Sequence, residues 1–213
     1  MPISRALDLS LYLVLDPDLC GGEAGMIRTA VEAAAGGASI IQLRTPSWKK
    51  RREAECARAL LQALRPLGVP LIIDDDADVA LAVQADGLHI GQDDLSPEDA
   101  RRLLGPDKII GLSVGSISEA EAVPRSLVDY VGIGPVYATQ TKKDAGAALG
   151  LEALAQLRQL AALPAVAIGG IKASNASEVM ASGVDGIAVV SAICGQSDPQ
   201  ASARALRELV RSA

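Results

Sequence analysis

The chain has 213 residues, of which 49% are hydrophobic, and its formal net charge at pH 7 is -6. This length and apolar content are sufficient to bury one substantial core. The negative charge argues against nucleic acid or an anionic membrane as a general partner. No apolar run reaches the roughly 18 residues that a membrane span requires. Because aromatic residues make up only 2% of the chain, the core must be aliphatic, and base stacking on aromatic platforms is disfavoured.

The first residues are interpreted as a strand and not as a signal peptide, because the apolar run is brief and no small-residue cleavage site follows it. Cys20, Cys56 and Cys194 lie far apart without metal-ligand spacing, so we expect free thiols in a reducing cytoplasm. We therefore expect a cytoplasmic protein. A homo-oligomer is compatible with this composition.

Short apolar runs recur along the chain, and segments with helical patterning separate most of them. The runs are rich in Val and Ile and mostly apolar on both faces, which is typical of strands covered on both sides of a parallel sheet. The eight runs span residues 11–16, 38–44, 69–74, 86–91, 108–114, 129–134, 164–170 and 185–191.

The segments between these runs carry helix signals. Residues 24–37, 48–68 and 150–164 show helical patterning that stops at Gly or Pro. Residues 96–105 begin with a serine N-cap, a proline and acids in the first turn, and residues 174–183 and 197–210 start similarly. This alternation predicts an α/β protein, a single (β/α)8 TIM barrel over residues 1–213, near the lower length limit of that fold. A doubly wound sheet is the alternative.

Barrel sites form where the strands end, so the last residue of each run is a candidate site residue. Gln42 and Arg44 end the second run and, two positions apart, point the same way. Ser113 ends the fifth run. Two acidic clusters follow the third and fourth runs: Asp74, Asp75 and Asp76, then Asp93 and Asp94.

Each acidic cluster has two explanations. Taken alone, either is a helix cap, and Asp76 in particular is placed to cap a helix over residues 77–83. Together at one face of the barrel, they favour Mg²⁺, which binds one or two protein carboxylates and fills its other positions with water and phosphate oxygens. Asp75 and Asp94 are then the candidate ligands, with Arg44 and Lys142 nearby for a diphosphate.

A second anion site is expected after the last two runs. Gly169 and Gly170 end the seventh run and Ser191 ends the eighth. Glycine turns ahead of a helix let backbone N–H groups approach a phosphate, although a lone glycine pair equally makes a tight turn. One metal-bridged diphosphate region and one metal-free monophosphate region together predict a coupling reaction that releases diphosphate.

At this point the motifs resemble the thiamine-phosphate synthase family along nearly the whole chain. The matching stretches are "QLR", "PLIIDDDADVALAVQADGLHIGQDD", "IIGLSV", "DYVGIGPVYATQTKKDA", "VAIGGI" and "GIAVVSAI". The resemblance implies a (β/α)8 transferase of thiamine biosynthesis. It would join a hydroxymethylpyrimidine diphosphate to a thiazole phosphate and release diphosphate, with Mg²⁺ as cofactor.

The resemblance also implies residue roles. Asp75 and Asp94 would bind Mg²⁺. The pyrimidine diphosphate would be held by Gln42, Arg44, Asp74, Ser113 and Lys142, of which Arg44, Ser113 and Lys142 are also expected to be catalytic. The thiazole phosphate would be held by Thr139, Gln140, Thr141, Gly170, Val190 and Ser191. His89, the single histidine, lies inside the fourth run and is interpreted as structural.

Two positions depart from the family pattern, both in the pyrimidine diphosphate half. Pro46 replaces the usual lysine, for which Lys49 or Lys50 is a possible substitute. Asp74 replaces the usual asparagine, and an ionised aspartate only accepts hydrogen bonds, so it adds negative charge beside a diphosphate. The alternatives are a tautomerase-like isomerase of the thiazole phosphate, a non-catalytic binder of it, and a domain derived from a fused pathway enzyme. The retained Asp75, Asp94 and Lys142 favour the synthase.

Overall fold

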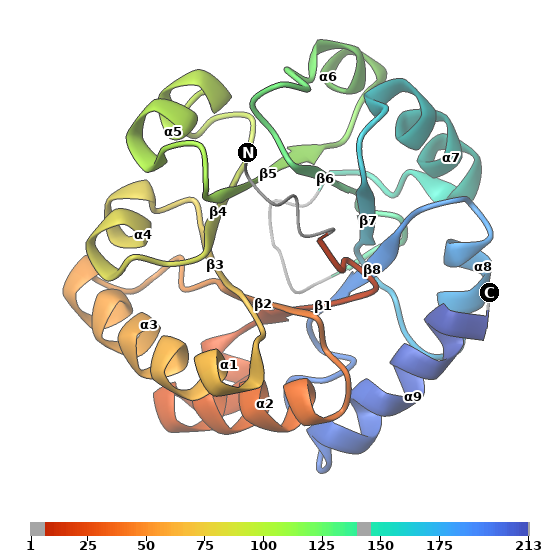
Figure 1. Cartoon of the computed structure of the whole chain (residues 1–213). Coiled ribbons are helices and arrows are strands. Elements are labelled where there is room, and N and C mark those ends of the chain that lie inside the picture. Colours follow the sequence, from red (N-terminus) through yellow and green to blue (C-terminus); the bar gives the residue numbers. More distant parts are fainter. Residues whose placement is uncertain (1–6, 140–145, 213) are drawn as a thin grey trace.

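The computed structural model describes residues 7–139 and 146–212. Eight parallel strands form a closed barrel in chain order, and β8 pairs with β1 (Figure 1). Closure confirms the predicted (β/α)8 barrel and excludes the doubly wound alternative. The strands are β1 (Leu11–Leu15), β2 (Ile40–Leu43), β3 (Leu71–Asp74), β4 (Gly87–Ile90), β5 (Ile109–Val114), β6 (Tyr130–Ile133), β7 (Ala165–Ile168) and β8 (Gly186–Val189).

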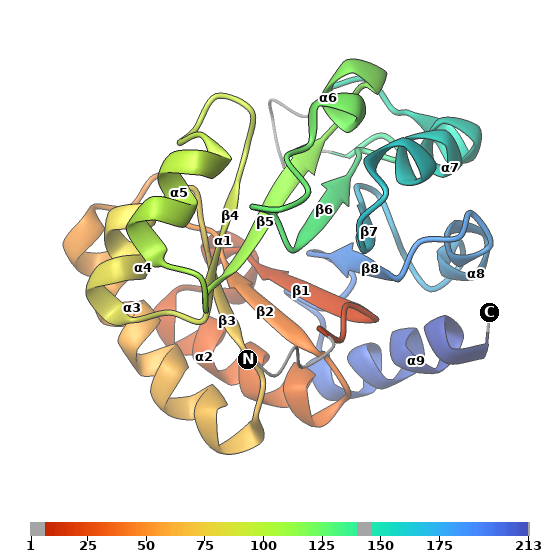
Figure 2. The same cartoon turned by 45° about the horizontal axis from the view of Figure 1, so that its top comes forward.

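The helices surround the ring of strands on its outside (Figures 1 and 2). None of those in the described part of the chain is long and apolar enough to cross a membrane. They are α1 (Pro17–Cys20), α2 (Glu23–Ala35), α3 (Lys50–Leu64), α4 (Ala77–Val83), α5 (Pro97–Leu104), α6 (Ile117–Ala122), α7 (Gly150–Ala161), α8 (Ala176–Met180) and α9 (Pro199–Ser212), with a 3₁₀ turn η1 (Arg65–Leu67) after α3.

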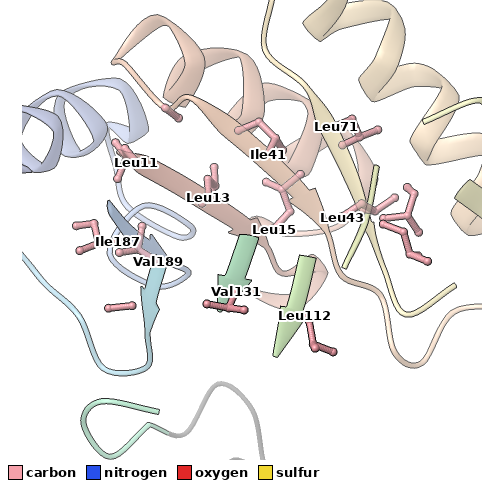
Figure 3. Close-up of a cluster of buried hydrophobic side chains, with 14 of the residues drawn as sticks. Leu11, Leu13, Leu15, Ile41, Leu43, Leu71, Leu112, Val131, Ile187 and Val189 are labelled. Carbon is pink, nitrogen blue, oxygen red and sulfur yellow. The ribbon is translucent and has the colours of Figure 1, made fainter. Parts of the chain in front are cut away.

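Strand alternation separates two hydrophobic clusters. Leu11, Leu13 and Leu15 of β1 belong to the large cluster between the barrel and the helices, part of which is drawn in Figure 3. Tyr12 and Val14 belong to a smaller cluster inside the barrel. The inner cluster consists of Leu9, Tyr12, Val14, Ile40, Ile72, Tyr130, Val166 and Ala188.

The helix starts agree with the sequence signals in part. Ser96 caps α5 as predicted, accepting a hydrogen bond from the backbone N–H of Asp99 at 3.1 Å. Asp76 occupies the N-cap position of α4, but its side chain makes no capping hydrogen bond. Instead it forms an ion pair with Lys50 at the start of α3, so the expected cap is replaced by a contact between helices.

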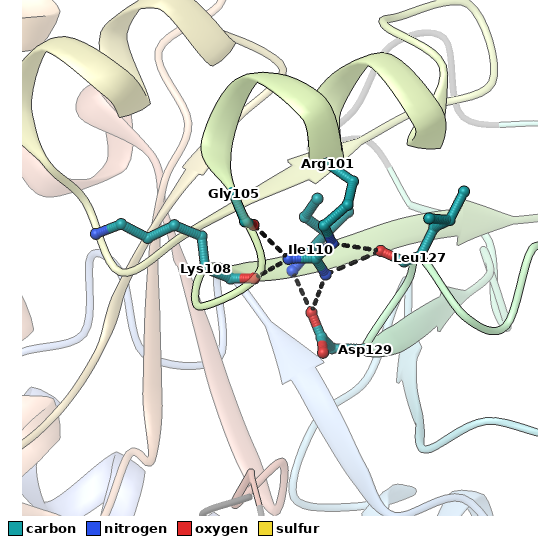
Figure 4. A network of polar contacts seen from close by, with 6 residues as sticks. All are labelled: Arg101, Gly105, Lys108, Ile110, Leu127 and Asp129. Atoms are coloured by element: carbon teal, nitrogen blue, oxygen red, sulfur yellow. Dashed lines mark hydrogen bonds and ion pairs between the residues drawn. The ribbon is translucent and has the colours of Figure 1, made fainter. Parts of the chain in front are cut away.

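Arg101 organises the opposite end of the barrel from the strand ends considered above (Figure 4). Its guanidinium donates to the carbonyl oxygens of Gly105, Lys108 and Leu127 at 2.6–3.1 Å and pairs with Asp129 at 2.8 Å. Asp129 also accepts from the backbone N–H of Ile110 at 2.7 Å. One side chain thus joins α5 to the segments that precede β5 and β6.

We expect Arg101→Ala to lower the free energy of unfolding by about 2–3 kcal/mol, because it leaves several partly buried acceptors without their donor. Arg102→Ala is the matched control. The Arg102 side chain is 76% exposed and, among the described residues, pairs with Asp99 alone, so we expect a change within about 0.5 kcal/mol. Urea denaturation of both variants measures the difference. Equal losses would contradict this role of Arg101.

Glu53 is a buried acid beside the Lys50–Asp76 contact. Only 1% of the residue is exposed, and its Oε2 atom has no hydrogen-bond partner among the described residues. Burial first, and then the neighbouring Asp76 carboxylate, raises the pKa of Glu53 from 4.5 to about 8. The folded chain therefore holds this proton more tightly than the unfolded chain does.

Because unfolding releases that proton, the contribution of Glu53 to stability is complete below about pH 4.5 and is lost as pH rises to about 8. We expect Glu53→Gln to remove a slope of about 1.4 kcal/mol per pH unit from the free energy of unfolding within this window. Denaturation at several pH values measures the slope. Glu55→Gln, an exposed acid on the same helix, should leave it unchanged.

Candidate functional site

The ends of the strands open into a cavity of about 300 Å³. It lies above the inner hydrophobic cluster, where inward-facing positions change from apolar to polar. Residues predicted from the sequence that line it are Gln42, Arg44, Asp74, Asp75, Ser113 and Thr139. Thr139 was assigned to the thiazole phosphate, but it borders this cavity and not the smaller one described below.

Asp74 is held by two donors from β2 and the residue that follows it. Arg44 Nε lies 3.3 Å from Asp74 Oδ2, and Gln42 Nε2 donates to Asp74 Oδ1. The Asp74 side chain is 12% exposed and the Arg44 side chain 21%. Arg44 and Gln42 therefore compensate the negative charge of Asp74. Neither a metal ion nor a proton is needed for this compensation.

His89 faces the barrel interior and lines the same cavity. Its Nε2 lies 3.0 Å from Ser113 Oγ, and its Nδ1 lies 2.9 Å from the hydroxyl oxygen of Tyr130. The Tyr130 hydroxyl in turn lies 2.8 Å from that of Tyr12. The histidine interpreted as structural is thus in contact with a predicted substrate-binding residue.

The two candidate metal ligands lie on successive loops, and of the two Asp75 lines the cavity. Asp75 has a left-handed backbone (φ 59°), and its N–H donates to the carbonyl oxygen of His89 at 2.8 Å. Asp94 Oδ2 accepts from the N–H of Gly91 at 2.8 Å, and Gly91 lines the cavity. No group of three or more ligating side chains occurs in the described ranges. The carboxylate oxygens of Asp75 and Asp94 are donors of the kind that Mg²⁺ prefers.

A smaller cavity of about 100 Å³ lies beside the first. Gly170, Val190 and Ser191 line it, as the sequence predicts for a phosphate site, and Lys172 also borders it. Gly170 has a φ of 66°, and a Cβ there would lie 2.7 Å from the Cβ of Tyr137. The glycine pair thus makes a tight turn and also borders the cavity, so both explanations of the motif apply.

Both cavities are lined by Arg44 and by Gly169, so they adjoin. Arg44 is the cation common to both among the described residues. The two cavities therefore provide two adjoining spaces for ligands, with one guanidinium common to both.

Several sequence-predicted residues are not brought into this geometry. Gln140, Thr141 and Lys142 lie outside the described residues. Lys50, a candidate replacement for the lysine lost at Pro46, pairs with Asp76 and with Asp78, the latter at 3.3 Å. Its charge is already neutralised there, and neither Lys49 nor Lys50 is among the described residues lining the two cavities.

Two further residues line the cavities, and the sequence carries a signal for each. Lys172 directly follows the "IGGI" stretch, so its position after β7 indicated a cation for the smaller cavity. His89 shares a strand face with Gly87, as alternation along β4 requires, and that face points inward. Because His89 is two positions after Gly87, alternation along β4 puts the His89 ring on the same inward face as Gly87.

The chain matches the family model described as thiamine monophosphate synthase over residues 11–193. A thiamine-phosphate synthase of Laribacter hongkongensis is 53% identical over 207 residues, covering 97% of this chain and 98% of that protein. One of Azorhizobium caulinodans is 55% identical over 205 residues, covering 96% of each. The solved thiamine phosphate pyrophosphorylase of Pyrococcus furiosus superposes with a TM-score of 0.86 at 38% identity, covering 97% of both chains.

These matches extend across the strands that form both cavities, and they confirm the family that the motifs predicted. The identities of about 50% run over nearly the full length of the chain and of its relatives. The chain therefore belongs to the thiamine monophosphate synthase family and is an enzyme of the transferase class.

Proposed function

We propose that the chain joins 4-amino-2-methyl-5-hydroxymethylpyrimidine diphosphate to 4-methyl-5-hydroxyethylthiazole phosphate, giving thiamine phosphate and diphosphate. The adjoining cavities that share Arg44 carry this proposal. A coupling reaction needs two substrates held next to each other, and the two cavities differ as a diphosphate and a monophosphate require. Asp75 lines the larger cavity beside the loop that carries Asp94, whereas a glycine turn and a lysine line the smaller one.

In this scheme the pyrimidine diphosphate occupies the larger cavity. Gln42 and Ser113 position it through hydrogen bonds, and Arg44 stabilises negative charge as the diphosphate departs. Lys142, whose sequence context matches the family, is expected to contact the same diphosphate. Because the electron-rich aminopyrimidine can carry a methylene cation, bond breaking runs ahead of attack by the thiazole nitrogen.

The thiazole phosphate occupies the smaller cavity, where Gly170, Val190 and Ser191 provide its border. Backbone N–H groups at the turn that follows β8 suit a phosphate group. We expect Thr139, Gln140 and Thr141 to contribute from the segment after β6. In this proposed arrangement, the thiazole ring would lie beside the methylene carbon that it attacks.

We propose Mg²⁺ as the cofactor, held by Asp75 and Asp94 together with diphosphate oxygens. When bound, this ion would neutralise charge on the leaving diphosphate. Small molecules are the expected partners. The free thiols of the three cysteines agree with the reducing cytoplasm that the sequence predicts.

Diphosphate release should depend on Mg²⁺ and on Asp75. We expect Asp75→Ala to lower kcat/KM by roughly a hundredfold or more, because the leaving group loses its main charge compensation. Asp107→Ala, an exposed acid on the loop before β5, controls for the change in net charge and should retain activity.

A coupled assay with both substrates measures the released diphosphate. Full turnover in excess chelator would overturn the proposed metal site. Isomerisation of the thiazole phosphate without the diphosphate substrate would support the tautomerase-like alternative instead.

A second prediction concerns Asp74. Because Arg44 and Gln42 already compensate its charge, Asp74→Asn should leave the KM for the pyrimidine diphosphate unchanged or raise it. Steady-state kinetics at saturating thiazole phosphate measure this. A KM lowered about tenfold would show instead that the carboxylate repels the diphosphate and that replacing it relieves the repulsion.

A further inference from the structure

Four polar side chains form a continuous chain of hydrogen bonds inside the barrel. It runs from Tyr12 to Tyr130 (2.8 Å), from Tyr130 to His89 Nδ1 (2.9 Å) and from His89 Nε2 to Ser113 Oγ (3.0 Å). The two tyrosines are 0–1% exposed, whereas Ser113 borders the larger cavity. This hydrogen-bond chain therefore connects the buried core to the larger cavity.

Two glycines leave space for the side chains of this hydrogen-bond chain. Gly111 lies between His89 and Tyr130 in the strand register, and a Cβ there would overlap the Tyr130 ring and lie 2.5 Å from His89 Nδ1. A Cβ on Gly132 would lie 3.1 Å from His89 Cε1. Glycine inside a strand weakens it, and here both glycines allow the close approach of side chains from neighbouring strands.

The direction in which the hydrogen bonds are donated along this hydrogen-bond chain follows from its buried end, at Tyr12. Tyr130 is the one hydrogen-bond partner of the Tyr12 hydroxyl in residues 7–139 and 146–212. Burial raises the pKa of both tyrosines, so both hydroxyls keep their hydrogens. Tyr12 must then donate to Tyr130, since a buried donor without an acceptor is disfavoured by roughly ten- to a hundredfold.

Each later step is fixed by the one before it. Tyr130 has a single hydrogen and receives one from Tyr12, so it donates to His89 Nδ1. Neutral imidazole carries one hydrogen, which must then be on Nε2 and point to Ser113 Oγ. Ser113 accepts this bond and keeps its own hydroxyl hydrogen for an acceptor in the cavity.

We propose that Tyr130 and His89 are positioning residues that hold Ser113 as a hydrogen-bond donor to the bound ligand. The inference rests on the proposed function only for the identity of that ligand, the pyrimidine diphosphate. The opposite direction would turn the Ser113 hydroxyl toward His89 and offer the ligand only lone pairs. A diphosphate carries acceptor oxygens, so only the first direction is productive with it.

The single histidine makes this testable, because histidine labelled with ¹⁵N reports on His89 alone. In the two-bond ¹H–¹⁵N spectrum at neutral pH, we expect a pyridine-like Nδ1 and a pyrrole-like Nε2. We expect the same pattern after addition of the pyrimidine diphosphate. The Nδ1–H tautomer, or a doubly protonated ring, in either state would overturn the proposal.

Tyr12→Phe removes the last hydroxyl of the hydrogen-bond chain while keeping the ring. The share of the Nε2–H tautomer should stay above about nine-tenths, because the buried Tyr130 hydroxyl then has His89 Nδ1 as its one acceptor among the described residues. Tyr137→Phe is the matched control, since the Tyr137 hydroxyl is buried without a partner among the described residues, and it should leave the spectrum unchanged. A fall of that share toward one-half in Tyr12→Phe would overturn the proposal, because the Tyr130 hydrogen would then not need His89 Nδ1 as its acceptor. Absence of turnover would overturn the proposed function but not the tautomer.

Discussion

The closed barrel allows each side chain only two directions, and the rest of the structure depends on this constraint. Because β8 pairs with β1, alternate residues point either to the surrounding helices or into an interior of fixed width. The outward positions build the large hydrophobic cluster, which supplies most of the buried apolar surface. The inward positions form only the small inner hydrophobic cluster, and inward polar side chains beyond that cluster face the cavity.

Within this interior, charge must be compensated locally. Asp74 is mostly shielded from water, and an unpaired carboxylate at such depth costs roughly several kcal/mol. Gln42 and Arg44, two positions apart on the neighbouring strand segment, both reach it because β2 and β3 pair in register. The departure from the family pattern at Asp74 is thus compensated by Gln42 and Arg44, the residues that we also propose to bind the substrate. The Asp74 carboxylate is paired with Arg44 and is not an exposed negative charge.

Much of the fold was predictable from the sequence, because eight Val- and Ile-rich runs and their Gly, Pro and Ser boundaries are local signals. The inward position of Gln42, Asp74 and Ser113 at strand ends followed from alternation. Two features were not predictable. The pairing of Asp76 with Lys50 depends on how α3 packs beside α4, and the four-residue chain at His89 depends on strands far apart in sequence. Both contacts join residues far apart in sequence, and no local sequence pattern encodes which distant residues will meet.

The position of His89 also bears on the kind of chemistry that the interior can support. Both ring nitrogens contact hydroxyl groups, and one of those groups is linked to a second buried tyrosine. A general base must instead have a nitrogen open to the proton that it removes. The one histidine of the chain is therefore arranged to orient a donor, while Arg44 and the carboxylates at the cavity mouth carry the charges. Such an interior suits a reaction that depends on stabilising a leaving anion more than on moving protons.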